Sequence, residues 1–219
     1  MEATTILFPE QSFNVSSPEV CTRLDHTWLY VRIYCHPKMS DDIILHILRP
    51  VEKELRKRGL ITQFFFIRYI EGGYHLRVRF YGTRQALLHS SRTYINTQIS
   101  QFFAQCGNVI DEPYDQGPDG MDDAQWQPWQ PHKVQRPMPS YEYDRYDPET
   151  DRYGGPDGLL ISEQHFQQSS YTAFRILEHE RMGLGPRQNA MLLLMEATAA
   201  AFGFSDRQKL DAFGRQFAY

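Results

Sequence analysis

The chain has few cysteines and no long hydrophobic run. Its three cysteines, Cys21, Cys35 and Cys106, are an odd number without CxxC spacing, so we expect buried thiols in a reducing compartment and no metal-binding knuckle. The longest apolar stretch, near residues 190–204, carries Glu196 and is too short to span a bilayer. No basic segment precedes the short apolar patch near the N-terminus, so no signal peptide is expected. These absences predict a soluble cytoplasmic protein without membrane association.

The chain also lacks a basic block and the common catalytic motifs. Its 23 Lys and Arg against 27 Asp and Glu give a formal net charge of −4, which argues against a general nucleic-acid binder. The eight histidines are scattered without HxxxH or HxxEH spacing, so no metal site is expected. The motifs GxSxG, GxxxxGK[ST] and GxGxxG do not occur either.

What the chain does contain is a pair of aromatic and β-branched runs. Residues 64–69 and 75–80 flank the pair Gly72-Gly73, a pattern typical of a β-hairpin. A two-residue turn at these glycines places Arg68 opposite Arg77, and Phe66 opposite Arg79. One face of the hairpin then carries the three arginines and His75. The other face is wholly apolar and consists of Phe65, Ile67, Tyr69, Leu76, Val78 and Phe80.

Two arginines directly opposite each other on paired strands repel unless an anion lies between them. The structural interpretation is a solvated face on which the arginines pair with nearby Asp or Glu of the same protein. The functional interpretation is an anion clamp, because guanidinium groups bind carboxylate or phosphate in a bidentate fork. The sequence favours neither interpretation over the other.

Strand and helix signals alternate along the first two thirds of the chain. Pro50 is expected to kink or restart the first helix, and Gly59 to end it. The order strand–helix–hairpin–helix predicts an α+β fold with a ferredoxin-like or split βαβ antiparallel sheet and packed helices. The expected elements outside the hairpin are strands near residues 4–8 and 28–34, a strand or an extended segment at 141–146, and helices over residues 40–59 and 84–106.

The last third of the chain predicts a helical segment. Residues 108–140 are rich in Pro, Gly, Gln and Trp and are expected to form an irregular insertion. The whole chain, residues 1–219, is expected to be a single domain. Ser162 is predicted to cap one helix, Pro186 to open a second that is apolar nearly all round and so buried, and Ser205 to begin a short third with Leu210, Phe213 and Phe217.

Several of these segments together resemble a known family. Trp28–Tyr34, the hairpin runs FFIRY and HLRVRF, and the ETDRYGG segment at residues 149–155 occur in this order. They resemble the C-terminal domain of class I lanthipeptide dehydratases, which also occurs as stand-alone thiopeptide-type bacteriocin biosynthesis proteins. The resemblance extends over residues 28–177, with a looser match through the closing helices.

The resemblance implies a lyase that acts in natural-product (lanthipeptide or thiopeptide-type) biosynthesis. It would eliminate glutamate from glutamylated Ser or Thr of a ribosomal precursor peptide and leave dehydroalanine or dehydrobutyrine. A separate glutamyl-tRNA-dependent enzyme would supply the ester, and no bound cofactor is implied because the ester already activates the leaving group. A homo-oligomer is compatible with this interpretation.

The resemblance also assigns residues to roles. By matching position, the catalytic arginines of the family fall on Arg77, Arg79 and Arg152, and the acid of its conserved motif falls on Glu149. Arg68, His75 and Tyr153 would contribute to the substrate pocket. His75 is of a residue type that suits a neutral general base, and equally a bystander.

One departure from the family pattern leaves other functions open. Family members usually continue into a segment His-Met-His-x-Asn-Arg that supplies a catalytic histidine, and this motif does not occur here. We expect that another histidine substitutes, that a partner supplies it, or that the chain is a non-catalytic member that binds precursor peptide or a dehydratase. A pyridine-forming cyclase acting on two dehydroalanines is a further alternative, against which the retained arginines argue.

Overall fold

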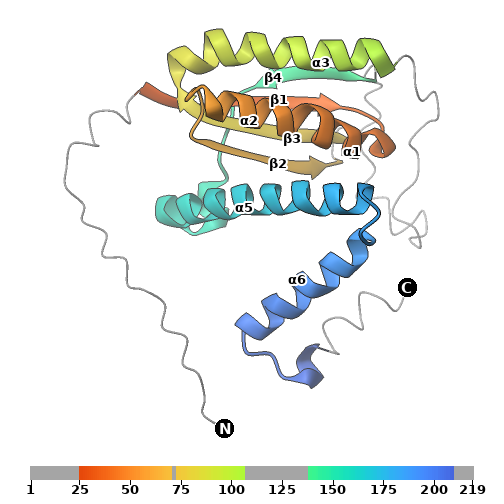
Figure 1. Ribbon diagram of the computed structural model, residues 1–219. Helices are drawn as coiled ribbons and strands as arrows, with labels where there is room; N and C mark the ends of the chain where they lie inside the picture. The colour runs from red at the N-terminus through yellow and green to blue at the C-terminus, as the bar shows by residue number, and fades with distance from the viewer. Residues whose placement is uncertain (1–24, 71–72, 107–137, 210–219) are drawn as a thin grey trace, which may run out of the picture.

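A four-stranded antiparallel sheet forms the centre of the computed structural model, which describes residues 25–70, 73–106 and 138–209 (Figure 1). The strand order is β2-β3-β1-β4. The strands are β1 (His26–Tyr34), β2 (Gln63–Tyr69), β3 (His75–Thr83) and β4 (Ser140–Asp144). The helices and helical turns are η2 (Pro37–Met39), α1 (Ser40–Ile43), η3 (Ile44–Leu48), α2 (Arg49–Lys57), η4 (Ala86–Ser91), α3 (Arg92–Cys106), η6 (Thr150–Tyr153), α5 (Gly155–Arg181) and α6 (Arg187–Ala201). The order of these elements confirms the predicted α+β class with a split βαβ arrangement.

The hydrophobic core lies between one face of the sheet and the helices α2 and α3 (Figure 1). In β1, expected as a strand over residues 28–34, apolar and polar residues alternate, which directs Leu29, Val31 and Ile33 into this core. Each large apolar side chain that becomes fully buried stabilises the fold by about 1.5–3 kcal/mol. The sheet and helix residues that are at most 2% exposed include Ile33, Phe64, Leu76, Phe80, Ile43, Ile47, Leu55, Leu87, Ile95 and Ile99.

Pro50 lies where the winding of the first long helix changes, which fits the restart that was one of the two predicted outcomes. The segment before it, η3, is wound as a π-helix, and α2 begins at Arg49 with Pro50 in its first turn, while the backbone stays helical from Ser40 to Lys57. The helix ends as predicted at Gly59, whose φ is +68°. The Gly59 N–H donates to the Arg56 carbonyl and the Leu60 N–H to the Leu55 carbonyl, both at 2.9 Å, as in a Schellman cap.

The predicted hairpin is present, but its predicted register is wrong by one residue. The structure pairs Tyr69 with His75, so Arg68 lies opposite Leu76 and Arg79 lies opposite Phe65. A shift of one residue moves every side chain of β2 to the other face of the sheet. The apolar face therefore contains Phe64 and Phe66 from β2, not Phe65, Ile67 and Tyr69, and Arg68 lies on the helix-covered face.

Helix α5 runs along β2 and protects the backbone of this edge strand (Figure 1). The side chain of Gln167 accepts from the Phe64 N–H at 3.1 Å, and Ser170 Oγ accepts from the Phe66 N–H at 3.0 Å. These bonds satisfy donors that an exposed edge would offer to another chain. Ser162 was predicted to cap this helix, which is wrong, because α5 begins at Gly155 and Ser162 Oγ donates to the Gly158 carbonyl inside it.

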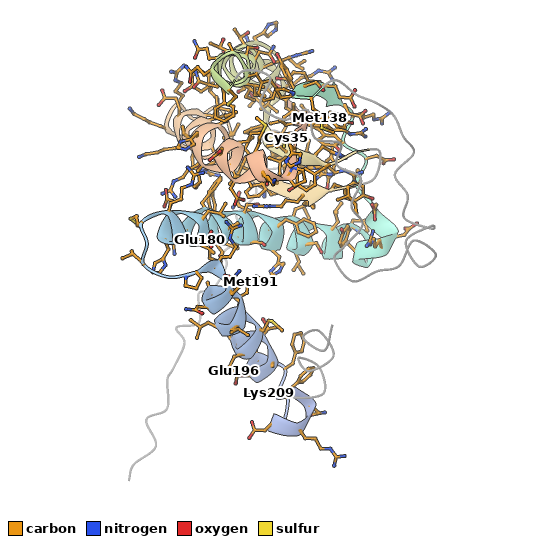
Figure 2. All side chains as sticks on the ribbon, turned by 90° about the vertical axis from the view of Figure 1, so that its right-hand side faces the viewer. Cys35, Met138, Glu180, Met191, Glu196 and Lys209 are labelled. Carbon is orange, nitrogen blue, oxygen red and sulfur yellow. The ribbon has the colours of Figure 1, made fainter. Side chains whose placement is uncertain are left out.

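Helix α6 begins after Pro186 as predicted, but the prediction that it is buried is wrong. Its leucines project into solvent, with Leu193 72% exposed, and Ala199 is its one buried residue. Figure 2 shows Met191 and Glu196 on the part of the helix that leads away from the sheet. Among the described residues, α6 contacts mainly the end of α5, so an all-round apolar surface has too few neighbours to bury it.

Some predictions fall partly or wholly outside the described residues. A capping box begins the last helix as predicted, since Gln208 Oε1 accepts from the Ser205 N–H at 2.9 Å, but Leu210, Phe213 and Phe217 are not described. The strand expected at residues 4–8 and most of the insertion at 108–140 also lie outside. Across residues 25–70, 73–106 and 138–209, no helix combines the length and apolarity needed to cross a membrane.

Candidate functional site

The sheet face opposite α2 and α3 carries a regular array of charged and aromatic side chains, which we call the arginine face. Cross-strand partners lie side by side on one face of a sheet, so the register of the four strands defines its rows. Read from β2 to β4, the rows are Phe65, Arg79, Tyr30 and Asp144, then Ile67, Arg77, Arg32 and Glu142, then Tyr69, His75, Tyr34 and Ser140. The predicted pair of Arg68 and Arg77 is wrong, and the arginines that face each other across paired strands are Arg32 and Arg77.

Arg79 is a buried cation to which no carboxylate of the described residues is hydrogen-bonded. The residue is 7% exposed, and its Nε and Nη1 atoms have no hydrogen-bond partner. Its guanidinium carbon lies 4.7 Å from the ring centre of Tyr30, 5.0 Å from Phe65 and 4.8 Å from Tyr146. Burial lowers the pKa of Arg79, with Arg77 adding to the effect, yet arginine stays protonated. The aromatic faces supply part of the stabilisation that a counter-ion would give.

Arg77 lies next to Arg79 along β3 and is held by two neighbours. Its guanidinium carbon is 3.3 Å from the ring centre of Tyr69, and its Nε donates to His75 Nε2 at 3.3 Å. His75 Nδ1 lies 2.7 Å from the Gly73 carbonyl oxygen. A carbonyl can only accept, so Nδ1 carries the proton and Nε2 accepts from Arg77. Both ring nitrogens of His75 are thus engaged, which suits a residue that orients Arg77.

A short helical turn, η6, brings the ETDRYGG segment to the border of the arginine face. Arg152 Nη1 donates to Glu149 Oε2 at 2.7 Å, and both side chains are more than half exposed. The hydrogen bond with Glu149 raises the pKa of Arg152, and electrostatic interactions with Glu149, Tyr153 and Tyr69 add to the effect. The Tyr153 ring packs edge-on against Phe166, with centres 5.5 Å apart.

Glycines allow the tight path of this segment. Gly154 and Gly155 have φ angles of +80° and +88°, which disfavour other residues. A Cβ on Gly158 would lie 1.9 Å from the Tyr153 carbonyl oxygen, so no other residue fits without moving the turn. The turn is therefore seated tightly on the start of α5.

Arg68, a predicted pocket residue, does not join the others. It lies on the helix-covered face, where its Nη2 donates to Asp41 Oδ1 at 2.5 Å and its Nη1 to Ser40 Oγ at 3.1 Å. The structure therefore brings together Arg77, Arg79 and His75, with Arg152, Glu149 and Tyr153 at the border, and separates Arg68 from them.

The structure adds acidic residues that the sequence did not single out. On β4, Glu142 accepts from the Tyr34 hydroxyl at 2.8 Å, and Asp144 accepts from Arg32. Near Arg79, the Tyr146 hydroxyl donates to Glu163 Oε1 at 2.9 Å. Burial raises the pKa of the Glu163 carboxyl, although Tyr146 and the charge of Arg79 act against it.

One of these additions was accessible from the sequence. The alternation over residues 28–34 places Arg32 on the face away from Leu29, Val31 and Ile33, hence with the hairpin arginines once β1 is paired with β3. The acids of β4 and α5 carry no comparable signal, because their positions depend on register and on tertiary packing.

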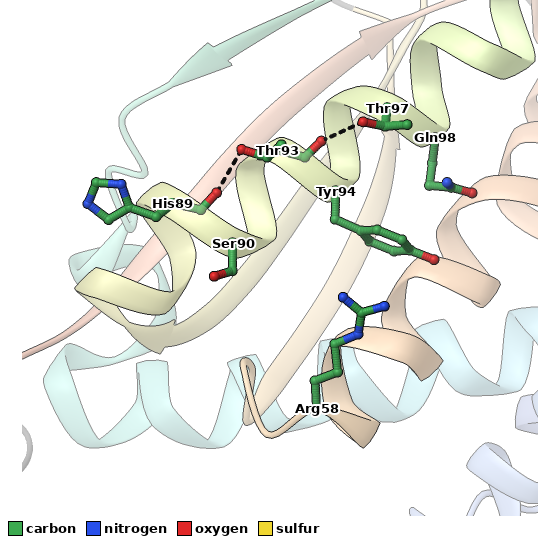
Figure 3. A pocket seen from close by; sticks show the side chains of 7 residues that line it. All are labelled: Arg58, His89, Ser90, Thr93, Tyr94, Thr97 and Gln98. Atoms are coloured by element: carbon green, nitrogen blue, oxygen red, sulfur yellow. Dashed lines mark hydrogen bonds between the residues drawn. The ribbon is translucent and has the colours of Figure 1, made fainter.

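A hollow on the helical side has fewer side chains suited to catalysis or ligand binding. It measures about 490 Å³ and lies along η4 and α3, with Thr93 and Thr97 donating to the carbonyls one turn before them (Figure 3). Its one arginine, Arg58, is already paired with Glu54 at 2.7 Å. Within the described parts of the chain, no cluster of His, Cys, Asp and Glu could hold a metal ion.

The comparisons with known proteins agree with the resemblance found in the sequence. The model of the lantibiotic biosynthesis dehydratase C-terminal domain matches residues 28–218. No sequence among curated proteins matches the chain.

Two solved structures share the fold. The tRNA-dependent lantibiotic dehydratase MibB from Microbispora sp. 107891 is 26% identical with a TM-score of 0.51, and the match covers 70% of this chain and 12% of MibB. The pyridine synthase TbtD from thiomuracin biosynthesis is 20% identical with a TM-score of 0.52, covering 71% of this chain and 49% of TbtD. The chain thus spans a minor part of both relatives. On the strength of the family match, it belongs to the lantibiotic biosynthesis dehydratase C-terminal family.

Proposed function

We propose that the chain is a lyase that eliminates glutamate from glutamylated Ser or Thr of a ribosomally made precursor peptide. Membership of the dehydratase C-terminal family supports a role in the biosynthesis of such peptides. The observation that carries the specific proposal is that Arg77 and Arg79 have no carboxylate partner among the described residues, while Arg32, Arg68 and Arg152 each have one. These two cations are therefore our candidates for binding an anionic ligand.

The proposed reaction is a β-elimination with a simple atom balance. A base takes the proton from Cα of the modified residue, and the electron pair forms the Cα=Cβ double bond. The bond from Cβ to the ester oxygen breaks, and glutamate leaves as a carboxylate. Negative charge therefore develops on the peptide enolate and on the leaving group, both of which preorganised cations stabilise.

The residues of the arginine face divide these tasks. Arg77 and Arg79 bind the glutamyl carboxylate and stabilise the developing charge. His75 is a positioning residue in this proposal, because both of its ring nitrogens already have partners. Arg152 joins the clamp by exchanging Glu149 for the substrate, which its high exposure permits. A separate glutamyl-tRNA-dependent enzyme would supply the esterified peptide.

Mass spectrometry of a Ser-glutamylated precursor peptide tests the proposal. The purified protein should convert it to the dehydroalanine product with release of glutamate. Arg77→Ala and Arg152→Ala should abolish the conversion, while Arg68→Ala, the same change on the opposite face of the same hairpin, should retain it. An unchanged glutamylated peptide, with the partner enzyme also present, would overturn the lyase and favour a non-catalytic peptide-binding role.

A further inference from the structure

The β4 edge of the arginine face is acidic, while its β3 side is basic. Asp144 and Glu142 belong to the same cross-strand rows as Arg79 and Arg77, with β1 between them. Each acid has 40% of its side chain exposed. Two strand spacings separate β3 from β4, about 9–10 Å. One face thus presents cations on β3 and carboxylates on β4, with β1 between them.

Arg32, between the two, belongs to the acidic side. Its Nη2 pairs with Asp144, its Nη1 lies 3.6 Å from Glu142, and its Nε donates to the Tyr30 hydroxyl at 2.9 Å. These contacts draw its guanidinium toward β4 and away from Arg77, which faces it across the strands. The charge of Arg32 is therefore balanced on β4 and leaves Arg77 and Arg79 as the cations that face a ligand.

The group that the proposed reaction expels carries both signs of charge. Glutamate in glutamyl-tRNA is esterified through its α-carboxyl, so the group transferred to Ser or Thr keeps a free α-ammonium as well as its side-chain carboxylate. A short carbon chain separates these two charges. An arginine clamp alone binds the carboxylate and leaves the ammonium in a basic environment, which is unfavourable.

We propose that Asp144, with Glu142 beside it, forms a subsite for the α-ammonium of the glutamyl group, while Arg77 and Arg79 bind its side-chain carboxylate. This inference rests on the proposed function, since it concerns the same substrate. A second feature of the same rows points to a ligand independently of the acids. Arg79 is more than nine-tenths buried with unpartnered nitrogens, and Tyr30 separates it from Asp144.

The subsite predicts which acyl groups the protein accepts. An ammonium gains charge-assisted hydrogen bonds from a carboxylate that a neutral or absent group cannot make. L-Glutamate should therefore bind more tightly than glutarate, which has the same carboxylate spacing and no ammonium. The difference should be about tenfold, the size of one hydrogen bond to a charged group.

Ligand-observed NMR titrations of the full chain with L-glutamate and with glutarate test this. The wild type should prefer glutamate, and Asp144→Asn or Glu142→Gln should reduce the preference toward one by weakening glutamate alone. Glu54→Gln is the matched control, because it removes an acid paired with Arg58 on the helical side and causes the same change in net charge. Its preference should equal that of the wild type.

Equal affinity of the wild type for both ligands, no detectable binding of glutamate, or a preference that survives both substitutions would overturn the subsite. The outcome is separable from that of the lyase test. Selective glutamate binding without elimination keeps the subsite and removes the lyase. Elimination without an ammonium preference keeps the lyase and removes the subsite.

Discussion

The arginines on the two faces of the β2–β3 hairpin differ in their partners. On the helix-covered face, Arg68 has a carboxylate from Asp41 and a hydroxyl from Ser40. On the arginine face, Arg77 and Arg79 have aromatic rings and an imidazole, and no carboxylate among the described residues. Since the cations come from one hairpin, residue type cannot separate structural from functional arginines. On this hairpin, a carboxylate partner is what distinguishes Arg68 from the two arginines that we propose as ligand-binding.

The difference has an energetic side. A buried charge whose polar atoms lack partners destabilises a folded protein, and aromatic faces compensate only in part. Arg79 is therefore retained at a cost to stability, a pattern expected where a side chain serves binding or catalysis. Arg68 lies in a half-exposed ion pair, which contributes little in either direction.

The largest expected effect comes from replacing each cation by methionine, an apolar residue of similar length. Arg79→Met should lower the rate of glutamate elimination by about 10²–10³-fold, as for loss of one preorganised donor, without lowering the free energy of unfolding. Arg68→Met should retain elimination and lose less than about 1 kcal/mol of stability with its ion pair. Mass spectrometric rates and urea unfolding measure the two quantities.

Two results would contradict this contrast between Arg79 and Arg68. A strongly destabilised Arg79→Met protein would mean that the aromatic contacts of Arg79 support the fold. Loss of elimination in Arg68→Met would mean that the helix-covered face takes part in the reaction.

A conservative change at Arg77 should have an intermediate effect. Lysine keeps the charge but loses the planar stacking on Tyr69 and the hydrogen bond to His75. Arg77→Lys should therefore slow elimination by about tenfold through misplaced charge. The equivalent change Arg68→Lys, which keeps its pair with Asp41, serves as the control and should leave the rate unchanged. Equal rates for Arg77→Lys and the wild type would show that any cation suffices there.

The fold was largely predictable from the sequence, and the register of the hairpin was not. The alternation in residues 28–34 identifies β1 and its core face, because apolar and polar residues alternate strictly. In β2 each face is apolar apart from one polar residue, Gln63 on one face and Arg68 on the other, so hydrophobicity does not distinguish the two registers. The predicted register followed from the assumption of a two-residue turn. The observed pairing of Tyr69 with His75 leaves a connection of more than two residues between β2 and β3.

The wrong register also led to a wrong prediction of which residues form the site. Because β3 kept its faces, Arg77, Arg79 and His75 lie together as predicted, whereas Arg68 was assigned to the wrong face. The acids on β4 enter through long-range pairing with β1, which a local pattern does not contain. The prediction that α6 is buried was wrong for a related reason. An apolar helix sequence does not show which elements of the protein pack against it.

The smallest expected effect is a difference in pH dependence between the two faces. Burial opposes the ionisation of Asp41, but hydrogen bonds from Arg187 and Arg68 outweigh it and hold the pKa of Asp41 below its usual value. A depressed carboxyl pKa stabilises the fold above the ordinary value, and this stabilisation is lost as the pH falls through the lowered pKa. For Glu163, burial raises the pKa, so ionisation destabilises the fold as the pH rises past the ordinary value of a glutamate.

Thermal unfolding between pH 3 and pH 7 checks both signs at once. At pH 7, Asp41→Asn should lower the midpoint of thermal unfolding relative to the wild type, and Glu163→Gln should raise it. Each shift should be at most about 4 °C. Both differences should shrink toward zero on acidification, because the wild-type carboxyls then become neutral like their amide replacements. A pH-independent difference for Asp41→Asn would mean that its amide disrupts packing, whereas the two expected curves would show that the ion pairs of Asp41 stabilise the covered face and that the ionised form of Glu163 destabilises the fold.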